Sequence, residues 1–208
     1  RYDKENALRT SLSFEFKHAE FFPIKDFPSV QDGRGAFSSF NRRLAVSLHG
    51  GKMNAAQFGA INMGGTEFVV ANTKIKPSKA TLSMKARGNL QNMLALVNHK
   101  PLSVFVRRGE DMPPVKGTID VTAELAFPMK KNLQIDDIRY QAKGLIVDFK
   151  MPNTEIMSAI SGPLVEFSLN AEALELKGHF QNAGVELDGQ FVYDLKKQTS
   201  SFAADFEI

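Results

Sequence analysis

The sequence predicts a mainly β protein, built as an antiparallel sheet with one or two short helices. Two observations lead to this fold class. Apolar and polar residues alternate with a period of two in many short segments, as they do in strands that bury one face. Turn-forming pairs such as Asp32-Gly33 and Gly64-Gly65 separate these segments. We therefore expect roughly a dozen short strands, whose short connections favour antiparallel pairing.

The clearest alternation runs from Thr118 to Phe127, where every second residue is apolar. The residues opposite them, Thr118, Asp120, Thr122 and Glu124, are polar, as expected for a strand with one side in water. The same pattern predicts the other strands. In chain order, the alternating segments are 12–16, 44–48, 80–86, 118–127, 165–171, 174–176, 185–187, 191–195 and 202–208.

Helical spacing occurs in two segments. The first follows Asn89, a residue type suited to an N-cap, and ends before Pro101. The second and weaker segment is 153–160, with Thr154 as its cap. A short turn is also expected at 21–27. The apolar stripe of the first helix consists of Leu90, Met93, Leu94 and Val97.

The domain organisation is expected to be simple. No linker rich in proline, serine or glycine divides the chain, so 1–208 is interpreted as a single unit with a weak seam near 108–114. The sequence begins at Arg1 without methionine and stops at Ile208 within an alternating stretch. We therefore expect it to be a segment of a longer protein.

Composition excludes several classes of protein. The 208 residues include no cysteine, which excludes a disulfide framework, a thiolate metal site and a thiol nucleophile. No apolar run approaches the roughly 18 residues of a membrane span. Net charge is +8 over 1–104 and −5 over 105–208, but basic residues gather only in pairs, so no nucleic-acid partner is expected.

Motifs of catalysis are missing from the sequence. It contains no Gly-x-Ser-x-Gly elbow, phosphate-binding loop or His-Glu-x-x-His, and its four histidines lie far apart. Asp136-Asp137 is an adjacent pair of carboxylates that could meet a cation only within a turn, and no further ligand is evident. We expect no enzymatic activity, no metal site and no cofactor.

One series of elements resembles a known family. A glycine-led short helix at 86–97 precedes Lys100-Pro101-Leu102, a strand from Gly117 ends in Phe127-Pro128-Met129, and an aspartate turn follows at 132–138. This order resembles the central domain of YhdP- and TamB-type envelope proteins in the AsmA-like superfamily. Residues 162–196 are similar to the glycine and hydrophobic repeats of that superfamily.

The resemblance implies an elongated, curved and open sheet, called a β-taco, whose hydrophobic groove transports phospholipid between inner and outer membranes and so supports the outer membrane. It also implies a periplasmic location, with an inner-membrane anchor outside this sequence. Phospholipid acyl chains would be the ligand. The alternative is a structural or interaction module of the cell envelope that scaffolds partner proteins, which the sequence does not identify.

The residues expected to line the groove are apolar and alternate along their strands. Alternation cannot distinguish an open groove from a closed core. The alternative is therefore that these residues are core residues, which pack only against one another or against the helix. The predicted lining residues are Ile119, Val121, Ala123, Leu125, Phe127, Val147, Phe149, Val165, Phe167, Leu169, Leu174 and Leu176.

Overall fold

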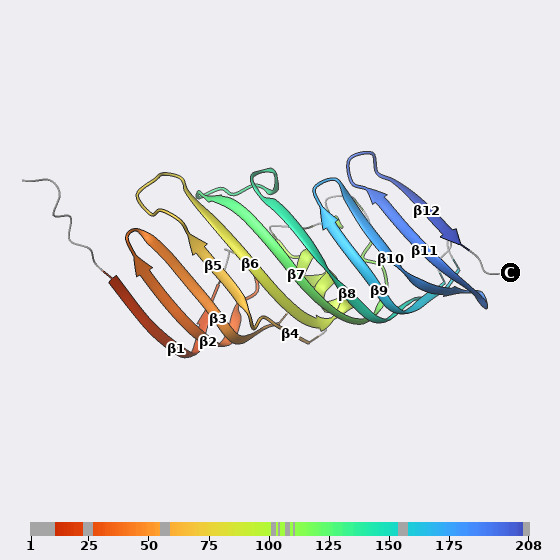
Figure 1. Ribbon diagram of the computed structural model, residues 1–208, viewed down its shortest axis with the longest axis horizontal. Coiled ribbons are helices and arrows are strands. Elements are labelled where there is room, and N and C mark those ends of the chain that lie inside the picture. The colour runs from red at the N-terminus through yellow and green to blue at the C-terminus, as the bar shows by residue number, and fades with distance from the viewer. Residues whose placement is uncertain are drawn as a thin grey trace, which may run out of the picture.

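The computed structural model describes residues 11–22, 27–54, 59–100, 103, 105–106, 109, 111–153 and 158–205. In this part of the chain, twelve strands form one antiparallel sheet, which is elongated and curved (Figure 1). The prediction of a mainly β antiparallel fold with a short helix is confirmed.

The strands follow the chain in long, regular hairpins. Segments predicted separately at 185–187 and 191–195 belong to one strand, which ends one residue before Leu195, and residues 206–208 of the last predicted segment lie outside the described residues. The strands are β1 (Ser11–Phe21), β2 (Val30–Phe40), β3 (Arg43–Asn54), β4 (Ala60–Asn62), β5 (Thr66–Val70), β6 (Ser78–Asn89), β7 (Lys116–Met129), β8 (Arg139–Met151), β9 (Ile160–Asn170), β10 (Ala173–Asn182), β11 (Val185–Asp194) and β12 (Thr199–Asp205).

Strand order in space follows strand order in sequence. The path runs from β1 to β12, with the short strands β4 and β5 sharing the position between β3 and β6. β6 and β7 pair from Ser78↔Met129 to Asn89↔Thr118, so the sheet continues across the segment 90–115 that separates them. Among the described strands, β1 pairs only with β2 and β12 only with β11, which leaves the sheet open at both ends.

The predicted first helix is α1 (Leu90–Val97), and it lies against one face of the sheet near β4, β6 and β7 (Figure 1). Asn89 caps its N-terminus, because its side-chain oxygen accepts the backbone N–H of Gln91 at 2.8 Å. The buried apolar residues of α1 are Leu90, Met93 and Leu96. Leu94 and Val97, which the predicted stripe included, are half-buried.

The other predicted local elements differ in outcome. The helix expected at 153–160 is not seen in the part that is described, because residues 154–157 lie outside it and Ile160 begins β9. Residues 23–26 of the expected turn at 21–27 also lie outside the described residues. The expected aspartate turn contains a short 3-10 helix, Ile135–Asp137. There, the Asp137 carboxylate accepts the Gln134 N–H at 2.8 Å.

Candidate functional site: an apolar inner face

The face of the sheet that α1 covers, here called the inner face, is apolar across all the strands. Register shows which side chains share it: Val121 is paired with Ala86 on one side and Gly144 on the other, and Ile146 is paired with Val165. Because paired residues point to the same side of a sheet, these positions define one continuous surface.

The half of the inner face nearest α1 is a closed core. Its buried side chains come from β2, β3, β4 and α1 as well as from β6 to β11. Val165 is fully buried, and Phe180 on the neighbouring strand is 2% exposed. The predicted lining residues that the structure places in this core are Ile119, Val121, Ala123, Phe149 and Val165. For these five, the alternative interpretation as core is the one that the structure supports.

The other half of the inner face, here called the open strip, carries apolar side chains that are only half-buried. Six predicted lining residues belong to it: Leu125, Phe127, Phe167, Leu169, Leu174 and Leu176. Phe167 and Leu176 pack against the edge of the core, whereas the other four extend beyond the core. The open strip therefore leaves part of its apolar surface accessible to a ligand or a partner protein.

The open strip is longer than the prediction, because the register extends it over every strand from β1 to β12. Its rings contact one another across strands: Phe14 stacks on Phe37 with centroids 4.9 Å apart, and Phe68 lies 6.4 Å from Phe127. Further members that the groove prediction missed are Phe14, Phe37, Val46, Phe68, Leu82, Tyr140, Phe191, Tyr193 and Phe202.

No charged side chain occupies an inner-face position of the open strip in the part of the chain that the structure describes. The strip crosses eleven strand positions, and strands lie about 4.8 Å apart, so its length is roughly 50 Å. Apolar surface of this extent on a protein marks a binding surface more often than a free one.

Val147 is the predicted lining residue that does not lie on the inner face, and the prediction is wrong for it. It is paired with Thr118 and Leu164 on the outer face and is 44% exposed. The reason is Asp148, whose φ of +54° places an irregularity in β8 beside a register shift in the β7 pairing. Phe149 therefore returns to the inner face, although it is only two residues from Val147.

The outer face is polar and carries the charges of the central strands. Arg87 is paired with Asp120, and Lys177 with Glu166. The amide of Gln141 donates to Glu124 at 2.8 Å. These contacts are exposed to solvent, so each contributes little to the free energy of unfolding. Their main consequence is that the outer face is polar whereas the inner face is apolar.

His179 on β10 lies between two carboxylates of β11. Its Nδ1 is 3.2 Å from an Asp188 oxygen, and its Nε2 is 3.6 Å from a Glu186 oxygen. The hydrogen bond to Asp188, together with the charges of both carboxylates, raises the pKa of His179 above its usual value. The contacts of His179 with Asp188 and Glu186 link β10 to β11 on the outer face.

Three carboxylates elsewhere in the acidic half, those of Asp137, Glu172 and Asp194, contact lysines. Lys130 Nζ lies 2.7 Å from the Asp137 carboxylate and, with the Gln134 N–H, lowers the pKa of Asp137. Asp136, its neighbour, has no part in a metal cluster, since no three His, Asp or Glu side chains among the described residues are arranged to hold an ion.

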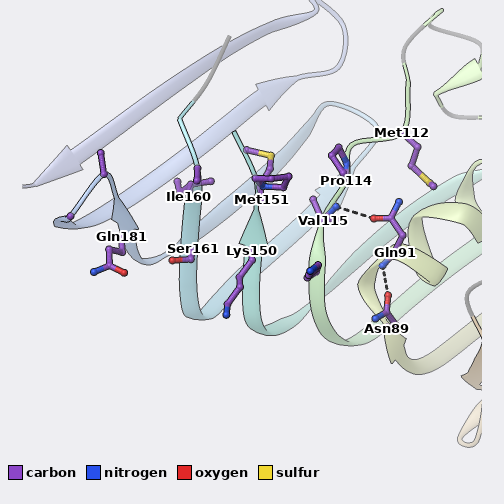
Figure 2. Close-up of a pocket in the computed structure, with 15 residues that line it drawn as sticks. Asn89, Gln91, Met112, Pro114, Val115, Lys150, Met151, Ile160, Ser161 and Gln181 are labelled. Atoms are coloured by element: carbon purple, nitrogen blue, oxygen red, sulfur yellow. Dashed lines mark hydrogen bonds between the residues drawn. The ribbon is translucent and has the colours of Figure 1, made fainter. Parts of the chain in front are cut away.

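A cavity that the sequence did not reveal lies at the α1 end of the inner face. Its volume is about 1030 Å³, and it is bounded by the end of β8, the start of β9, the end of β10 with the turn that follows it, the start of β7 and the first turn of α1 (Figure 2). Its apolar walls include Met112, Pro114, Val115, Met151, Pro152 and Ile160. These residues are far apart in the chain, and no local pattern connects them.

Gln91 holds one wall of this cavity in place. Its side-chain Oε1 accepts the backbone N–H of Val115 at 2.9 Å, which joins the segment before β7 to the start of α1 (Figure 2). The residues just before Val115 are Pro113 and Pro114, which have no N–H to donate. Val115 is therefore the first residue after these prolines whose backbone can anchor the segment.

In the described part of the chain, no helix has the length and apolar character needed to cross a membrane. No protein-family model matches the chain, and no curated protein or solved structure matches it at a significant level. The geometry of the inner face and the sequence resemblance are the grounds for a functional proposal.

Proposed function

We propose that this chain is a non-enzymatic segment of an AsmA-like periplasmic protein that carries phospholipid acyl chains along its open strip. The observation that carries the proposal is the strip itself, an uncharged apolar surface that crosses the sheet from β1 to β12 with its side chains half-exposed. A chain of methylene groups gains free energy on such a surface without any directional contact.

The dimensions of the strip suit transport rather than a single binding event. The hydrocarbon core of a bilayer is about 30 Å thick, so the acyl chains of one leaflet occupy about 15 Å. A strip of roughly 50 Å exceeds one chain length about threefold. A lipid could therefore move along the strip with its chains in continuous contact with apolar side chains.

The sequence resemblance supplies the rest of the proposal. We propose that the lipid moves between inner and outer membranes, that this movement supports the outer membrane, and that an anchor lies outside this sequence. The absence of charge on the strip agrees with them, because a charged group there would have to be desolvated by each passing chain.

The proposal is tested by photocrosslinking at positions that differ only in the face they occupy. A photoreactive phenylalanine replaces Phe127 or Leu169 on the open strip, and Glu124 or Ser168 on the outer face of the same strands. After incubation with phosphatidylethanolamine and phosphatidylglycerol vesicles, mass spectrometry should detect phospholipid adducts at Phe127 and Leu169 alone. Equal labelling of both faces, or none, contradicts the proposal.

The alternative function is a structural or interaction module of the envelope, and the two unpaired sheet edges favour it. β1 and β12 each have one edge that no described strand covers, and such edges can pair with a strand of another protein. Crosslinking in cells from Ser13 and Ser201 should then capture one protein reproducibly, with no phospholipid on Phe127 or Leu169.

A further inference from the structure

The turns at one edge of the sheet carry a concentration of basic residues. These turns join the strand ends that lie farthest from α1, and they form the upper edge of the sheet in Figure 1. This edge, here called the rim, borders the open strip rather than the closed core. The rim consists of residues 41–42, 71–77, 130–138, 171–172 and 195–198.

Basic residues that are far apart in the chain meet along the rim. Arg42 lies between β2 and β3, Lys74 and Lys76 lie between β5 and β6, the pair 130–131 lies between β7 and β8, and the pair 196–197 lies between β11 and β12. The rim therefore has seven lysines or arginines and three carboxylates. In the described parts of the turns at the opposite edge, the charged side chains are one lysine and one aspartate.

Two of the three rim carboxylates are held by rim lysines. Lys130 Nζ lies 2.7 Å from the Asp137 carboxylate, and Lys196 Nζ lies 2.9 Å from that of Glu172. Asp136 is the third rim carboxylate. The other rim cations outnumber it, and several of them are exposed and have no ion pair with a described residue. These unpaired cations are Arg42, Lys74, Lys76 and Lys131.

The open strip is about one acyl chain deep between the closed core and the rim. On β7, Ala123 is the last buried inner-face residue and Met129 ends the strand, a distance of about 20 Å at about 3.3 Å per residue. On β9, Val165 and Asn170 are about 17 Å apart on the same basis. Because the acyl chains of one leaflet occupy about 15 Å, a chain that lies along these strands brings its headgroup to the rim.

Neighbouring turns of the rim are spaced so that one anionic group can contact both. The four unpaired cations belong to three successive turns, those between β2 and β3, β5 and β6, and β7 and β8. Two strand spacings separate each of these turns from the next, which is about 10 Å. A phosphate between two turns would be about 5 Å from each of them. The long, flexible side chains of lysine and arginine reach over that distance.

From these observations we propose that the rim selects lipids with a net negative headgroup, whose phosphate it binds while the acyl chains lie on the open strip. This inference rests on the proposed function and specifies its substrate class. An uncharged apolar strip bordered by unpaired cations complements a molecule with apolar chains and an anionic head. A zwitterionic head carries its own cation, which the rim repels, so it gains less from the same contacts.

The test uses the 208-residue chain with a photoreactive phenylalanine in place of Phe127. The probes are dioctanoyl phosphatidylglycerol and dioctanoyl phosphatidylcholine, each below the concentration at which it forms micelles. Phosphatidylglycerol should give about tenfold more adduct, which is what two exposed charge contacts together supply. No bilayer is present in these samples. A preference that appears only with vesicles therefore overturns headgroup selection and assigns the rim to docking on an anionic membrane.

Glycerol phosphate, which is the anionic head without chains, distinguishes a lipid site from a site for free phosphate. At the same concentration as the lipid it should not reduce the adduct at Phe127, because it gains nothing from the strip. Equal competition by glycerol phosphate and by unlabelled phosphatidylglycerol overturns the joint use of strip and rim.

Two variants with the same change of net charge locate the selectivity. The first removes the unpaired rim cations and should make labelling by the two lipids equal. The second removes four exposed lysines of the outer face and should leave the preference intact. A preference that survives in the first variant, or is lost equally in both, overturns the role of the rim. The variants are Arg42→Gln/Lys74→Gln/Lys76→Gln/Lys131→Gln and Lys52→Gln/Lys85→Gln/Lys143→Gln/Lys177→Gln.

Salt dependence keeps the proposal falsifiable if a charge variant does not fold. With the native rim, the phosphatidylglycerol adduct should fall toward the phosphatidylcholine level between about 50 mM and about 500 mM salt, because exposed charges are screened. The phosphatidylcholine adduct should stay constant. Equal labelling by both lipids at low salt overturns the selectivity of the rim and leaves the proposed function standing. No adduct with either lipid overturns the proposed function, and with it this inference.

Discussion

The side chain of Gln91 and the backbone of Val115, 24 residues apart in sequence, are joined by a hydrogen bond of 2.9 Å at the start of α1. This bond determines where the chain enters β7, and therefore where one wall of the cavity lies. Val115 is buried and the bond is partly buried, so water replaces the acceptor only incompletely if the Gln91 side chain is removed.

Replacing Gln91 with leucine should reduce the free energy of unfolding by about 1–3 kcal/mol, because the Val115 N–H would be left without an acceptor. Urea denaturation followed by circular dichroism measures the change. Gln141→Leu is the matched control, since its side chain only meets Glu124 on the exposed outer face and should matter by less than about 0.5 kcal/mol. Equal losses in both variants would contradict the anchoring role.

An aspartate on the two halves of the inner face should have different effects. Val121→Asp, in the closed core, should cost more than about 3 kcal/mol because an unpaired charge would be buried. Phe127→Asp, on the open strip, should cost only about 1–2 kcal/mol and abolish phospholipid crosslinking. Thermal melts with the crosslinking assay separate the two outcomes.

Thr122→Asp is the control for this pair, because Thr122 lies between Val121 and Ala123 but points to the outer face, beside Lys85 and Lys143. It should leave both stability and crosslinking nearly unchanged. If Phe127→Asp unfolds the protein as Val121→Asp does, the open strip is part of the closed core and the transport proposal loses its main support.

Gly144 on β8 allows the sheet to curve beneath an aromatic ring. A Cβ at this position would lie 2.0 Å from the Asp120 carbonyl oxygen and 2.9 Å from the Phe167 ring. Since the backbone oxygen cannot move aside without breaking the pairing, Gly144→Ala should cost about 1–3 kcal/mol in urea denaturation.

Gly88→Ala is the comparison for Gly144. The atoms nearest its added methyl group lie at 3.4 Å, an ordinary van der Waals contact, and its φ is outside the left-handed region. We expect its stability to be unchanged or raised by about 0.5 kcal/mol, because alanine restricts the unfolded chain. A Gly144→Ala protein as stable as Gly88→Ala would show that the sheet relaxes at this point.

The link between His179 and Asp188 should make stability depend on pH. The pKa of His179 is raised in the folded state, so its contribution is fully present below the unfolded value of about 6.5 and is lost as pH rises through the raised folded value. Thermal melts at about pH 5.5 and about pH 8.5 should show this loss, and His179→Gln should remove that part of the difference. An NMR titration that gives His179 a lowered pKa would contradict it.

Much of the fold could be predicted from the sequence, because alternation is a local property. Thr118 to Phe127 forms a strand with the predicted sides buried and exposed, and Asn89 caps the predicted helix. The prediction failed at Val147, since alternation assumes a regular strand and the left-handed Asp148 interrupts it.

The sequence by itself determined which residues can form strands and that most strands have one apolar side. Only the tertiary structure decided which apolar residues are core and which remain half-exposed, because that depends on where α1 packs against the sheet and on which strands contribute to the same core. Val165 and Leu169 alternate identically, yet one is fully buried and the other belongs to the open strip. The cavity likewise exists only where Met112, Met151 and Ile160 meet, since its walls come from chain segments that no local pattern connects.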